Sequence, residues 1–252
     1  MIETAITRKP GFDFSQGLTT TCGPPPVRDQ VVSQHEAYVD TLMSLGLAVL
    51  ELPEAPGFPD ACFIEDAAVV LAELAVVTRP GAVSRRGETE AVRSALEPFR
   101  PLAVIEPPGT LEGGDVLVAG RTVFIGISSR TNPDGAGQLE AHLAPLGYRC
   151  RRVPVARGLH LKSCLSLVSN DTLIMAGAYS HRPEFRHFRR ITPIPEDMEA
   201  CNCLRINDTL LMPRGFPRVR DLLVSLDLPL MEVTISEFQK MDGGLTCLSL
   251  RF

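Results

Sequence analysis

The stretch that decides the fold is Met241-Asp242-Gly243-Gly244-Leu245-Thr246-Cys247-Leu248-Ser249-Leu250-Arg251-Phe252. Two glycines lead into a short alternating run, which predicts a turn followed by a strand. In a strand, Leu245, Cys247 and Ser249 would face one side and the residues between them the other. Similar short runs recur upstream, and each opens with a polar residue. We therefore interpret this stretch as the last member of a series.

The opening polar residues of the series are separated by 47, 48, 42 and 45 positions. They are Glu65, Glu112, His160, Asn202 and Cys247. A period in this range is typical of radial or stacked repeats. Each unit contains a hairpin and a further strand, in most units with a helix between them. The series predicts a single-domain, five-bladed α/β propeller with pseudo-fivefold symmetry over residues 1–252.

The last unit lacks a return strand, because the sequence ends at Phe252. A matching strand is available at the other end, where Ala5–Gly11 (AITRKPG) is similar to Ala75–Gly81 (AVVTRPG). We expect this N-terminal strand to close the ring, since closure pairs edges that would otherwise be exposed. An open α/β sheet with ordinary crossovers is the alternative, but it leaves the tandem hairpins and their spacing unexplained.

Local patterns predict the connecting elements. Apolar residues at helical spacing indicate helices over 28–45, 88–99, 135–146 and 216–226. The stretch 12–27 cannot form regular structure and predicts a functional loop. The stretch 181–190 is rich in Arg and His; we interpret it as an exposed loop rather than an anion or metal site.

The composition excludes several classes of protein. A hydrophobic content of 44% with 22% charged residues is that of an ordinary soluble globular protein. The net charge of −5 argues against nucleic acid as the main partner, and no stretch approaches the 18 apolar residues of a membrane span. Seven irregularly spaced cysteines favour a reducing compartment, so we expect a cytoplasmic protein. Cys201-x-Cys203 has no second pair of ligands beside it in the sequence, so we do not expect a structural zinc site.

The repeat gives distant polar residues a reason to lie close together. If the register holds, Cys247, His160 and the carboxylates of Glu65 and Glu112 surround one axial pocket. This set could supply a nucleophile, an acid–base group and a cation-binding group. Taken singly, each signal is weak, because a lone Cys is more often a small buried residue and a lone His a structural hydrogen-bonder. Asn202 shows no obvious chemistry, and we expect it to have a pocket-wall or structural role.

Four motifs along the chain carry a family resemblance. They are Asp60-x-x-x-x-Glu65-Asp66, Leu111-Glu112-Gly113-Gly114-Asp115, His160-Leu161-Lys162-Ser163 and Asp242-Gly243-Gly244-Leu245-Thr246-Cys247. In this order and spacing the chain resembles the dimethylarginine dimethylaminohydrolases over essentially its whole length. These belong to the guanidino-modifying pentein superfamily, which also contains arginine deiminases and amidinotransferases. Glu-Gly-Gly-Asp alone would not be specific, but the four motifs together are.

The resemblance implies hydrolysis of Nω-methylated L-arginine to L-citrulline and methylamine or dimethylamine, without a metal or organic cofactor. Cys247 would attack the guanidinium carbon and form an S-alkylthiouronium intermediate. His160 would protonate the departing amine and then activate water. Glu112 would orient His160 and stabilise its charged form.

The resemblance also implies substrate contacts. Asp66, with Glu65 and Asp60 nearby, would hold the guanidinium nitrogens. Arg85 and Arg130 would bind the substrate α-carboxylate, although Arg86 competes with Arg85 for the first of these places. Leu18, in the loop 12–27, matches the position of a mobile lid. A homodimer is implied as well, but no exposed apolar stripe in the sequence demands one.

Two alternatives remain open at this point. Arginine deiminases of the superfamily carry His-x-Asp, whereas the position two after His160 is Lys162 here, which favours a substrate whose second nitrogen is methylated. A non-catalytic binding propeller, as in the ribosome anti-association factors, belongs to a different functional class. Such a protein need not keep Cys, His and Glu together at the pore.

Overall fold

The computed structural model describes residues 1–156 and 158–252, which form an α/β fold with five sheets of three strands each. In chain order the sheets are β15–β1–β2 (Leu250–Arg251, Thr4–Arg8, Ala48–Leu52), β3–β4–β5 (Ala68–Val70, Ala75–Val77, Leu102–Val104), β6–β7–β8 (Val116–Ala119, Thr122–Ile127, Arg149–Pro154), β9–β10–β11 (Leu165–Leu167, Thr172–Met175, Arg189–Ile191) and β12–β13–β14 (Leu204–Ile206, Thr209–Pro213, Leu230–Val233). In every sheet the middle strand is antiparallel to the strand named first and parallel to the strand named last.

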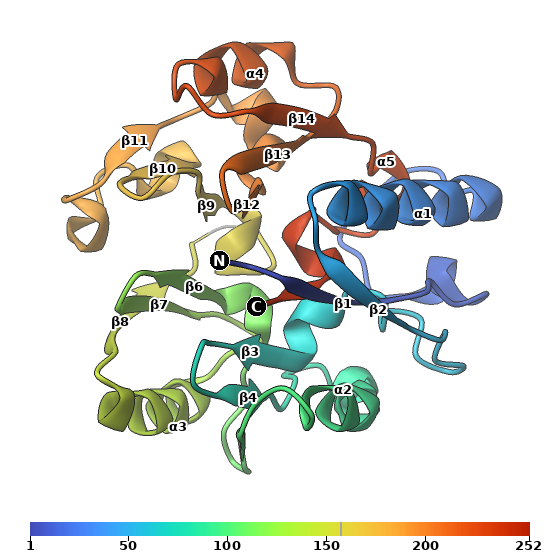
Figure 1. The fold of residues 1–252 in the computed structure, drawn as a ribbon, viewed down its shortest axis with the longest axis vertical. Coiled ribbons are helices and arrows are strands. Elements are labelled where there is room, and N and C mark those ends of the chain that lie inside the picture. Colours follow the sequence, from blue (N-terminus) through green and yellow to red (C-terminus); the bar gives the residue numbers. More distant parts are fainter. Residues whose placement is uncertain (157) are drawn as a thin grey trace.

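Helices supply the crossovers that parallel pairing requires. The helices α1 (Arg28–Ser44), α2 (Thr89–Leu96), α3 (Pro133–Leu143) and α4 (Pro217–Val224) each join the middle strand of a sheet to its parallel neighbour. In the fourth sheet two 3-10 turns, Gly177–Tyr179 and Pro183–Phe185, take this place. Figure 1 shows the helices α1 to α4 at the periphery and the strands toward the middle. No helix in the described ranges has the length and apolar character needed to cross a membrane.

The four helices expected from apolar spacing are present, with ends that differ by at most three residues. The helix α3 begins earlier than expected, because the Asn132 side chain caps it by accepting a hydrogen bond from Gly135 N at 2.8 Å. Pro133 follows at the first helical position, where its missing N–H costs nothing. A short helix that the sequence did not indicate, α5 (Ser236–Gln239), precedes the C-terminal stretch.

The short strand expected over the C-terminal run 245–250 is wrong for most of its length. Residues Thr246–Leu248 form a 3-10 turn, and only Leu250–Arg251 belong to a strand. The turn is tied down by polar contacts, since Thr246 N donates to Asn202 Oδ1 at 3.0 Å and Arg251 donates to Thr246 O at 2.8 Å. The run that opens with Glu65 also begins with a turn and not with a strand. The 3-10 turn Ile64–Ala67 precedes the three-residue strand β3.

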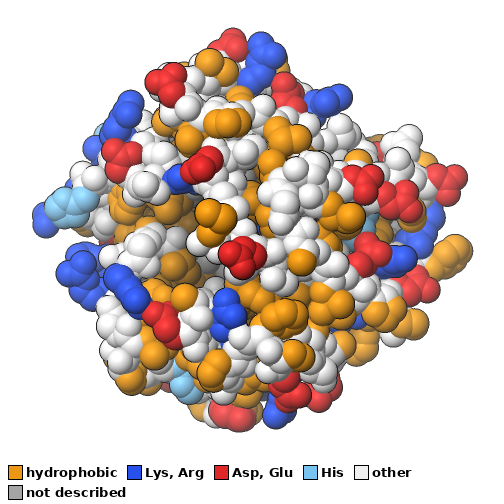
Figure 2. Space-filling model, viewed as in Figure 1, with side chains coloured by type: hydrophobic (Ala, Val, Ile, Leu, Met, Phe, Trp, Pro, Cys, Tyr) orange, Lys and Arg blue, Asp and Glu red, His pale blue; other side chains and the backbone are white. Residues whose placement is uncertain are grey.

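The Arg- and His-rich stretch 181–190 is largely exposed, as expected, but its end is not a loop. Arg189–Ile191 form the edge strand β11, which pairs in parallel with β10. The side chains of Arg189 and Arg190 are exposed. In the view of Figure 2, Lys and Arg side chains gather at the left edge, where Figure 1 places β8, β10 and β11. Charged residues hid this strand because they show no apolar alternation.

The two ends of the chain pair with each other. Strand β1 is antiparallel to β15, with Ala5 opposite Arg251 and Ile6 opposite Leu250. Both chain ends therefore lie near the middle of the molecule (Figure 1). Helix α1 packs against the same region, because Val31, Tyr38 and Leu42 belong to one buried cluster with Leu245 and Leu248.

Tyr38 connects α1 to the C-terminal stretch through its hydroxyl group. The side chain is fully buried, and its Oη lies 2.6 Å from Ser249 Oγ and donates to Leu245 O at 3.1 Å. Buried polar groups cannot bind solvent water, so each needs a hydrogen-bond partner within the protein. The Tyr38 hydroxyl group and its two partners supply one another with such bonds. Tyr38 thus fixes the segment on either side of Cys247 against the helix.

We expect Tyr38→Phe to lower the free energy of unfolding by about 1–3 kcal/mol, because it leaves Leu245 O and Ser249 without their buried partner. The matched control is Tyr148→Phe, whose hydroxyl group contacts the more exposed Glu73 at 2.8 Å. That change should cost less than about 0.5 kcal/mol. Urea unfolding of the three proteins measures both values. Equal costs at the two positions would contradict the role assigned to Tyr38.

Candidate active site

Short turns carry the polar residues of the repeat into one region. Asp66 lies in the 3-10 turn Ile64–Ala67, and Cys247 in Thr246–Leu248. Glu112 and His160 immediately precede the turns Gly113–Asp115 and Leu161–Ser163. Each turn leads directly, or within two residues, into the first strand of its sheet. The sheets therefore deliver these side chains to equivalent positions.

His160 and Glu112 form a buried pair. His160 Nε2 lies 2.6 Å from Glu112 Oε2, and Glu112 is completely buried. The second oxygen, Oε1, accepts from Ala82 N at 3.2 Å and lies 3.4 Å from Arg130 Nη1. Both carboxylate oxygens thus have donors, which allows a charge to persist without solvent.

Electrostatics keep this pair ionised. Burial lowers the pKa of His160, but the Asp66 charge and the hydrogen bond to Glu112 outweigh it and raise that pKa to about 9. Burial likewise raises the pKa of Glu112, but the hydrogen bond and charge of His160 outweigh it and lower that pKa to about 2. His160 is therefore a protonated imidazolium at neutral pH, held by a carboxylate.

The two glycines of Glu112-Gly113-Gly114-Asp115 allow the turns to approach closely. A Cβ atom at Gly113 would lie 2.0 Å from the backbone oxygen of Glu65. One at Gly114 would lie 2.7 Å from the ring of His160 and 2.8 Å from Asp66 Oδ1. Only glycine permits these contacts, so the motif is a packing requirement of the site as well as the source of Glu112.

Asp66 joins the buried pair to Arg85. Its Oδ1 accepts from Gly114 N at 2.9 Å and lies 3.8 Å from His160 Nε2, while Oδ2 lies 2.6 Å from Arg85 Nη1. Arg85 is also bound to the Glu88 carboxylate at 2.9 Å. Arg86, the competing candidate from the sequence, instead donates to Pro80 O at 3.1 Å. Arg85, whose side chain is almost fully buried, is the one that faces the site.

Cys247 is the middle residue of the 3-10 turn Thr246–Leu248, and its sulfur atom accepts a hydrogen bond from a backbone amide. Gly244 N donates to Sγ at 3.4 Å. Burial raises the pKa of the Cys247 thiol to about 12, with the charges of Glu65 and Asp66 acting in the same direction. The empty site therefore holds a neutral thiol beside carboxylates, an arrangement in which a bound cation would favour the thiolate.

A raised pKa does not distinguish Cys247 from the other cysteines. Burial also raises the pKa of Cys201 to about 12 and that of Cys150 to about 11. What sets Cys247 apart is its place in a cavity with His160, not its acidity. Among the other cysteines, Cys22 is exposed in the loop 12–27.

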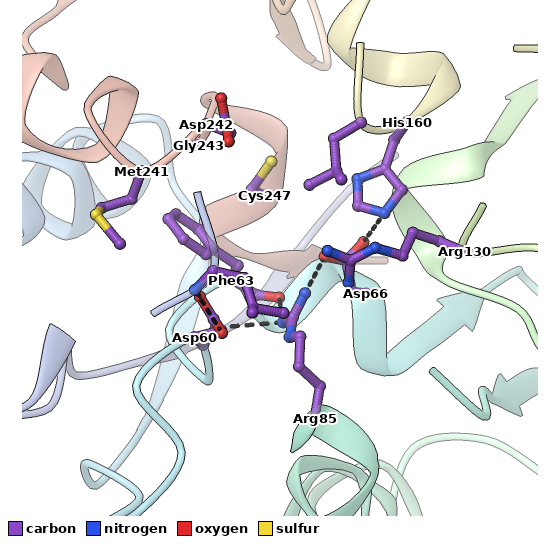
Figure 3. A pocket seen from close by; sticks show the side chains of 12 residues that line it. Asp60, Phe63, Asp66, Arg85, Arg130, His160, Met241, Asp242, Gly243 and Cys247 are labelled. Carbon is purple, nitrogen blue, oxygen red and sulfur yellow. Dashed lines mark hydrogen bonds and ion pairs between the residues drawn. The ribbon is translucent and has the colours of Figure 1, made fainter. Parts of the chain in front are cut away.

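One cavity contains most of the residues that the sequence singled out. Its lining residues are Leu18, Asp60, Phe63, Asp66, Arg85, Arg130, Leu159, His160, Met241, Asp242, Gly243 and Cys247. Figure 3 shows His160, Cys247 and Asp66 around this space, with Arg85 and Arg130 nearby. Glu112 is bound to the imidazole of His160 but does not itself line the cavity. Five regions of the chain, around Leu18, at 60–85, at Arg130, at 159–160 and at 241–247, therefore meet here.

Sequence reasoning missed several lining residues. Phe63 lies between two motif positions, and Leu159 directly precedes His160, so their neighbours were the only signal. Met241 and Asp242 belong to the C-terminal stretch itself, but nothing in the pattern assigned them a role. Apolar wall residues carry no chemical signature, and only the cavity reveals them.

The structure does not bring the side chain of Glu65 to this cavity. Its carboxylate lies 2.7 Å from Lys162 Nζ and 2.9 Å from Arg251 Nη2, and it accepts from Thr246 Oγ1 at 2.7 Å. Asn202 does not line the cavity either. Its amide holds Thr246 by donating to Oγ1 and accepting from the backbone N, next to Cys247.

Asp60 holds the loop that crosses the mouth of the cavity. Its carboxylate accepts from Leu18 N at 3.0 and 3.2 Å, and a Cβ atom at Gly17 would lie 2.4 Å from Oδ1. Burial raises the pKa of Asp60, and Arg85 opposes this shift. Leu18 lines the cavity although its exposed fraction is 42%, so it lies where the cavity meets the solvent.

Asp66, Glu112 and His160 are also the side chains best placed to hold a metal ion, because one ligand atom of each lies within 4.8 Å of the others. Their charges are already balanced by protein groups. Arg85 contacts Asp66, and the imidazolium of His160 contacts Glu112. A divalent ion would have to displace these contacts and tolerate Arg85 nearby, so the residues fit a cationic guanidinium better than a metal.

Comparison with known proteins places the chain in a family. A family model described as "N,N dimethylarginine dimethylhydrolase, eukaryotic" matches residues 25–184. A dimethylarginine dimethylaminohydrolase from Pseudomonas aeruginosa is 38% identical over the full length of both chains. One from Streptomyces coelicolor is 39% identical over 98% of this chain and 96% of its own.

Solved structures agree with this relationship. The Pseudomonas aeruginosa enzyme, as a cysteine-to-serine mutant in complex with citrulline, has a TM-score of 0.98 at 37% identity, with all of both chains covered. The N-terminal domain of ArgZ, an arginine dihydrolase, has a TM-score of 0.89 at 22% identity, which shows a shared fold alone. From its full-length similarity to the first two relatives, the chain belongs to the dimethylarginine dimethylaminohydrolase family.

Proposed function

We propose that this protein hydrolyses Nω-methylated L-arginine, both asymmetric dimethylarginine and monomethylarginine, to L-citrulline and dimethylamine or methylamine. The observation that carries the proposal is the cavity in which Cys247 meets His160, with Glu112 bound to the imidazole at 2.6 Å. A nucleophile, a protonated acid and a carboxylate that orients it are the groups this reaction needs. The citrulline bound to the Pseudomonas aeruginosa relative supports the same product.

Substrate binding follows from the charges around the cavity. Asp66 and Asp60 are buried carboxylates in its wall, and they would attract the guanidinium group. Arg85 and Arg130 supply positive charge in the same wall, and they would bind the α-carboxylate. Most donors of Arg85 are already engaged by Asp66, Glu88 and two backbone oxygens, so Arg130 would provide the freer contact.

The bound cation would also activate the nucleophile. Burial and nearby carboxylates hold the resting thiol neutral. A guanidinium group beside Sγ and next to Asp66 compensates those negative charges and lowers the pKa of Cys247. The thiol proton would leave to solvent as the substrate binds. The thiolate would then attack the guanidinium carbon, and the carbon–sulfur bond would form as the carbon loses planarity.

His160 would act twice. As an imidazolium it gives its proton to the departing amine, so the carbon–nitrogen bond breaks and a neutral amine leaves. The neutral imidazole then takes a proton from water while the hydroxide adds to the carbon of the thiouronium. The carbon–sulfur bond then breaks, the departing sulfur takes the proton of the new hydroxyl group, and citrulline forms. His160 is again protonated beside Glu112.

Lys162 supports the choice of a methylated substrate over free arginine. It stands where deiminases carry a second carboxylate, and its Nζ is bound to Glu65 at 2.7 Å, outside the cavity lining. No carboxylate at this position is available to accept two hydrogens from the far guanidinium nitrogen. Methyl groups on that nitrogen are then tolerated.

The architecture that we propose for residues 1–252 is a single-domain, five-bladed α/β propeller, the pentein fold, closed by the N-terminal strand. Five sheets with one strand order and the pairing of β1 with β15 support it. We further propose a cytoplasmic location, in keeping with the seven irregularly spaced cysteines of the sequence. The homodimer implied by the family resemblance, and the absence of nucleic-acid partners, stay predictions.

We expect the wild-type protein to release citrulline from asymmetric dimethylarginine faster than from free arginine at equal concentration. Cys247→Ser should lower this turnover by at least roughly 10³-fold, because the hydroxyl group is a far weaker nucleophile. Cys150→Ser, a half-buried cysteine outside the cavity, is the matched control and should retain activity. Citrulline release and the mass of the Cys247 peptide during turnover are the measurements. Faster hydrolysis of arginine would contradict the substrate assignment.

Removing the charge of Glu112 should change the pH dependence. In the wild type, His160 stays protonated up to its pKa of about 9, so the acid step is lost only as the pH rises above that value. Glu112→Gln leaves burial in place, which lowers the pKa of His160, and removes one of the charges that raise it. The alkaline limb of the kcat profile should therefore move to lower pH. An unchanged limb in the variant would show that His160 is not the acid.

A further inference from the structure

Three consecutive threonines of the loop over the cavity converge on one carboxylate. Thr20 Oγ1 lies 3.0 Å from Asp242 Oδ1, and Thr21 Oγ1 also lies 3.0 Å from that oxygen. Thr19 Oγ1 is 3.3 Å from Oδ2, and the backbone N of Thr20 donates to Oδ2 at 2.5 Å. Four donors of the loop thus share the two oxygens of Asp242.

Little else holds this part of the loop. Residues 18–21 have no regular secondary structure, and all four are exposed. Among the described residues, their other hydrogen bonds to the body of the protein are two. Leu18 N donates to the Asp60 carboxylate, and Thr19 Oγ1 donates to Lys240 O at 3.2 Å. The position of Leu18 over the cavity therefore depends on two carboxylates, one at each side of the mouth.

Asp242 is suited to this contact by its backbone. Its φ angle is 59°, in the left-handed region, where Asp and Asn are tolerated better than other non-glycine residues. This conformation lies at the turn that leads into Gly243 and Gly244, whose N–H donates to Cys247 Sγ. The residue that holds the loop and the nucleophile are thus placed by the same short turn.

We propose that Asp242 is a positioning residue that holds loop 18–21 closed over the cavity and so controls access to Cys247. Charge-assisted hydrogen bonds from hydroxyl and amide groups stabilise the closed loop, and their loss raises the population of an open one. The identity of the molecule that the loop covers, a methylated arginine, rests on the proposed function. The closure itself does not depend on that identity.

Two sets of changes remove the contact from opposite sides. Asp242→Asn keeps a residue that accepts the left-handed backbone but removes the charge and one acceptor oxygen. The combined change Thr19→Val, Thr20→Val and Thr21→Val removes three hydroxyl donors without changing any charge. Asp227→Asn is the matched control, because Asp227 is exposed and also has a positive φ angle, of 53°.

The primary measurement is the rate at which neutral iodoacetamide alkylates Cys247 in the absence of substrate. It is followed by mass spectrometry on the peptide that bears Cys247, so that the exposed Cys22 does not contribute. We expect both variants to react roughly tenfold faster than the wild type, with Asp227→Asn unchanged. A variant that carries all four changes should react no more than about twice as fast as the faster of the two, because both remove the same contact.

In both variants, but not in Asp227→Asn, the KM for asymmetric dimethylarginine should rise by roughly tenfold. The kcat should change by less than about threefold, because the reacting groups are untouched. Unchanged alkylation in both variants would overturn the proposal. Effects that multiply in the combined variant would also overturn it, since Asp242 would then act on the substrate or on Cys247 directly. If the wild type fails to hydrolyse the substrate, the proposed function is wrong, yet the alkylation rates still test the closure.

Discussion

The pairing of the two chain ends is the constraint on which the site depends. Strand β15 is only two residues long and is bound on one side by β1. Cys247 stands three residues before it, so the sulfur atom reaches the cavity because the N-terminal strand holds the end of the chain. Tyr38, from the helix between β1 and β2, holds the same segment through Ser249 and Leu245. One strand pair and one hydroxyl group therefore help to position Cys247.

Buried charges around the cavity are balanced in a chain. Glu88 contacts Arg85, which contacts Asp66, and the imidazolium of His160 lies between Asp66 and Glu112. Each ion has a partner of opposite sign, which offsets the cost of removing it from water. Asp60 and Asp66 nevertheless line the cavity with Cys247. Burial raises the pKa of the Cys247 thiol, and the charges of Glu65 and Asp66 act in the same direction. In the function proposed above, a bound cation would compensate these negative charges and favour the thiolate of Cys247.

A second network, beneath the site, keeps the remaining charges out of the cavity. Glu65 is bound by Lys162 and Arg251, and Thr246 links it to Asn202. These contacts hold the turn that bears Cys247 from the side opposite to the cavity. Adjacent residues in one motif, Glu65 and Asp66, thus serve different purposes, because the 3-10 turn directs their side chains in different directions.

The sequence by itself determined the repeat and most of the chemistry. Spacing alone predicted repeated units, and five sheets of one strand order are present. It also predicted that His160, Glu112 and Cys247 would lie together, because equivalent positions in a repeat meet in space. Only the tertiary structure decided which neighbour of a motif faces the cavity. A 3-10 turn replaced the expected strand at Thr246–Leu248. Contacts with Asn202, which is distant in the sequence, and with Arg251, which follows the turn, fix this conformation. The alternation of apolar residues carries no information about such contacts. For the same reason the pairing of Asp242 with the threonines, more than 200 residues away, could not be read from either segment alone.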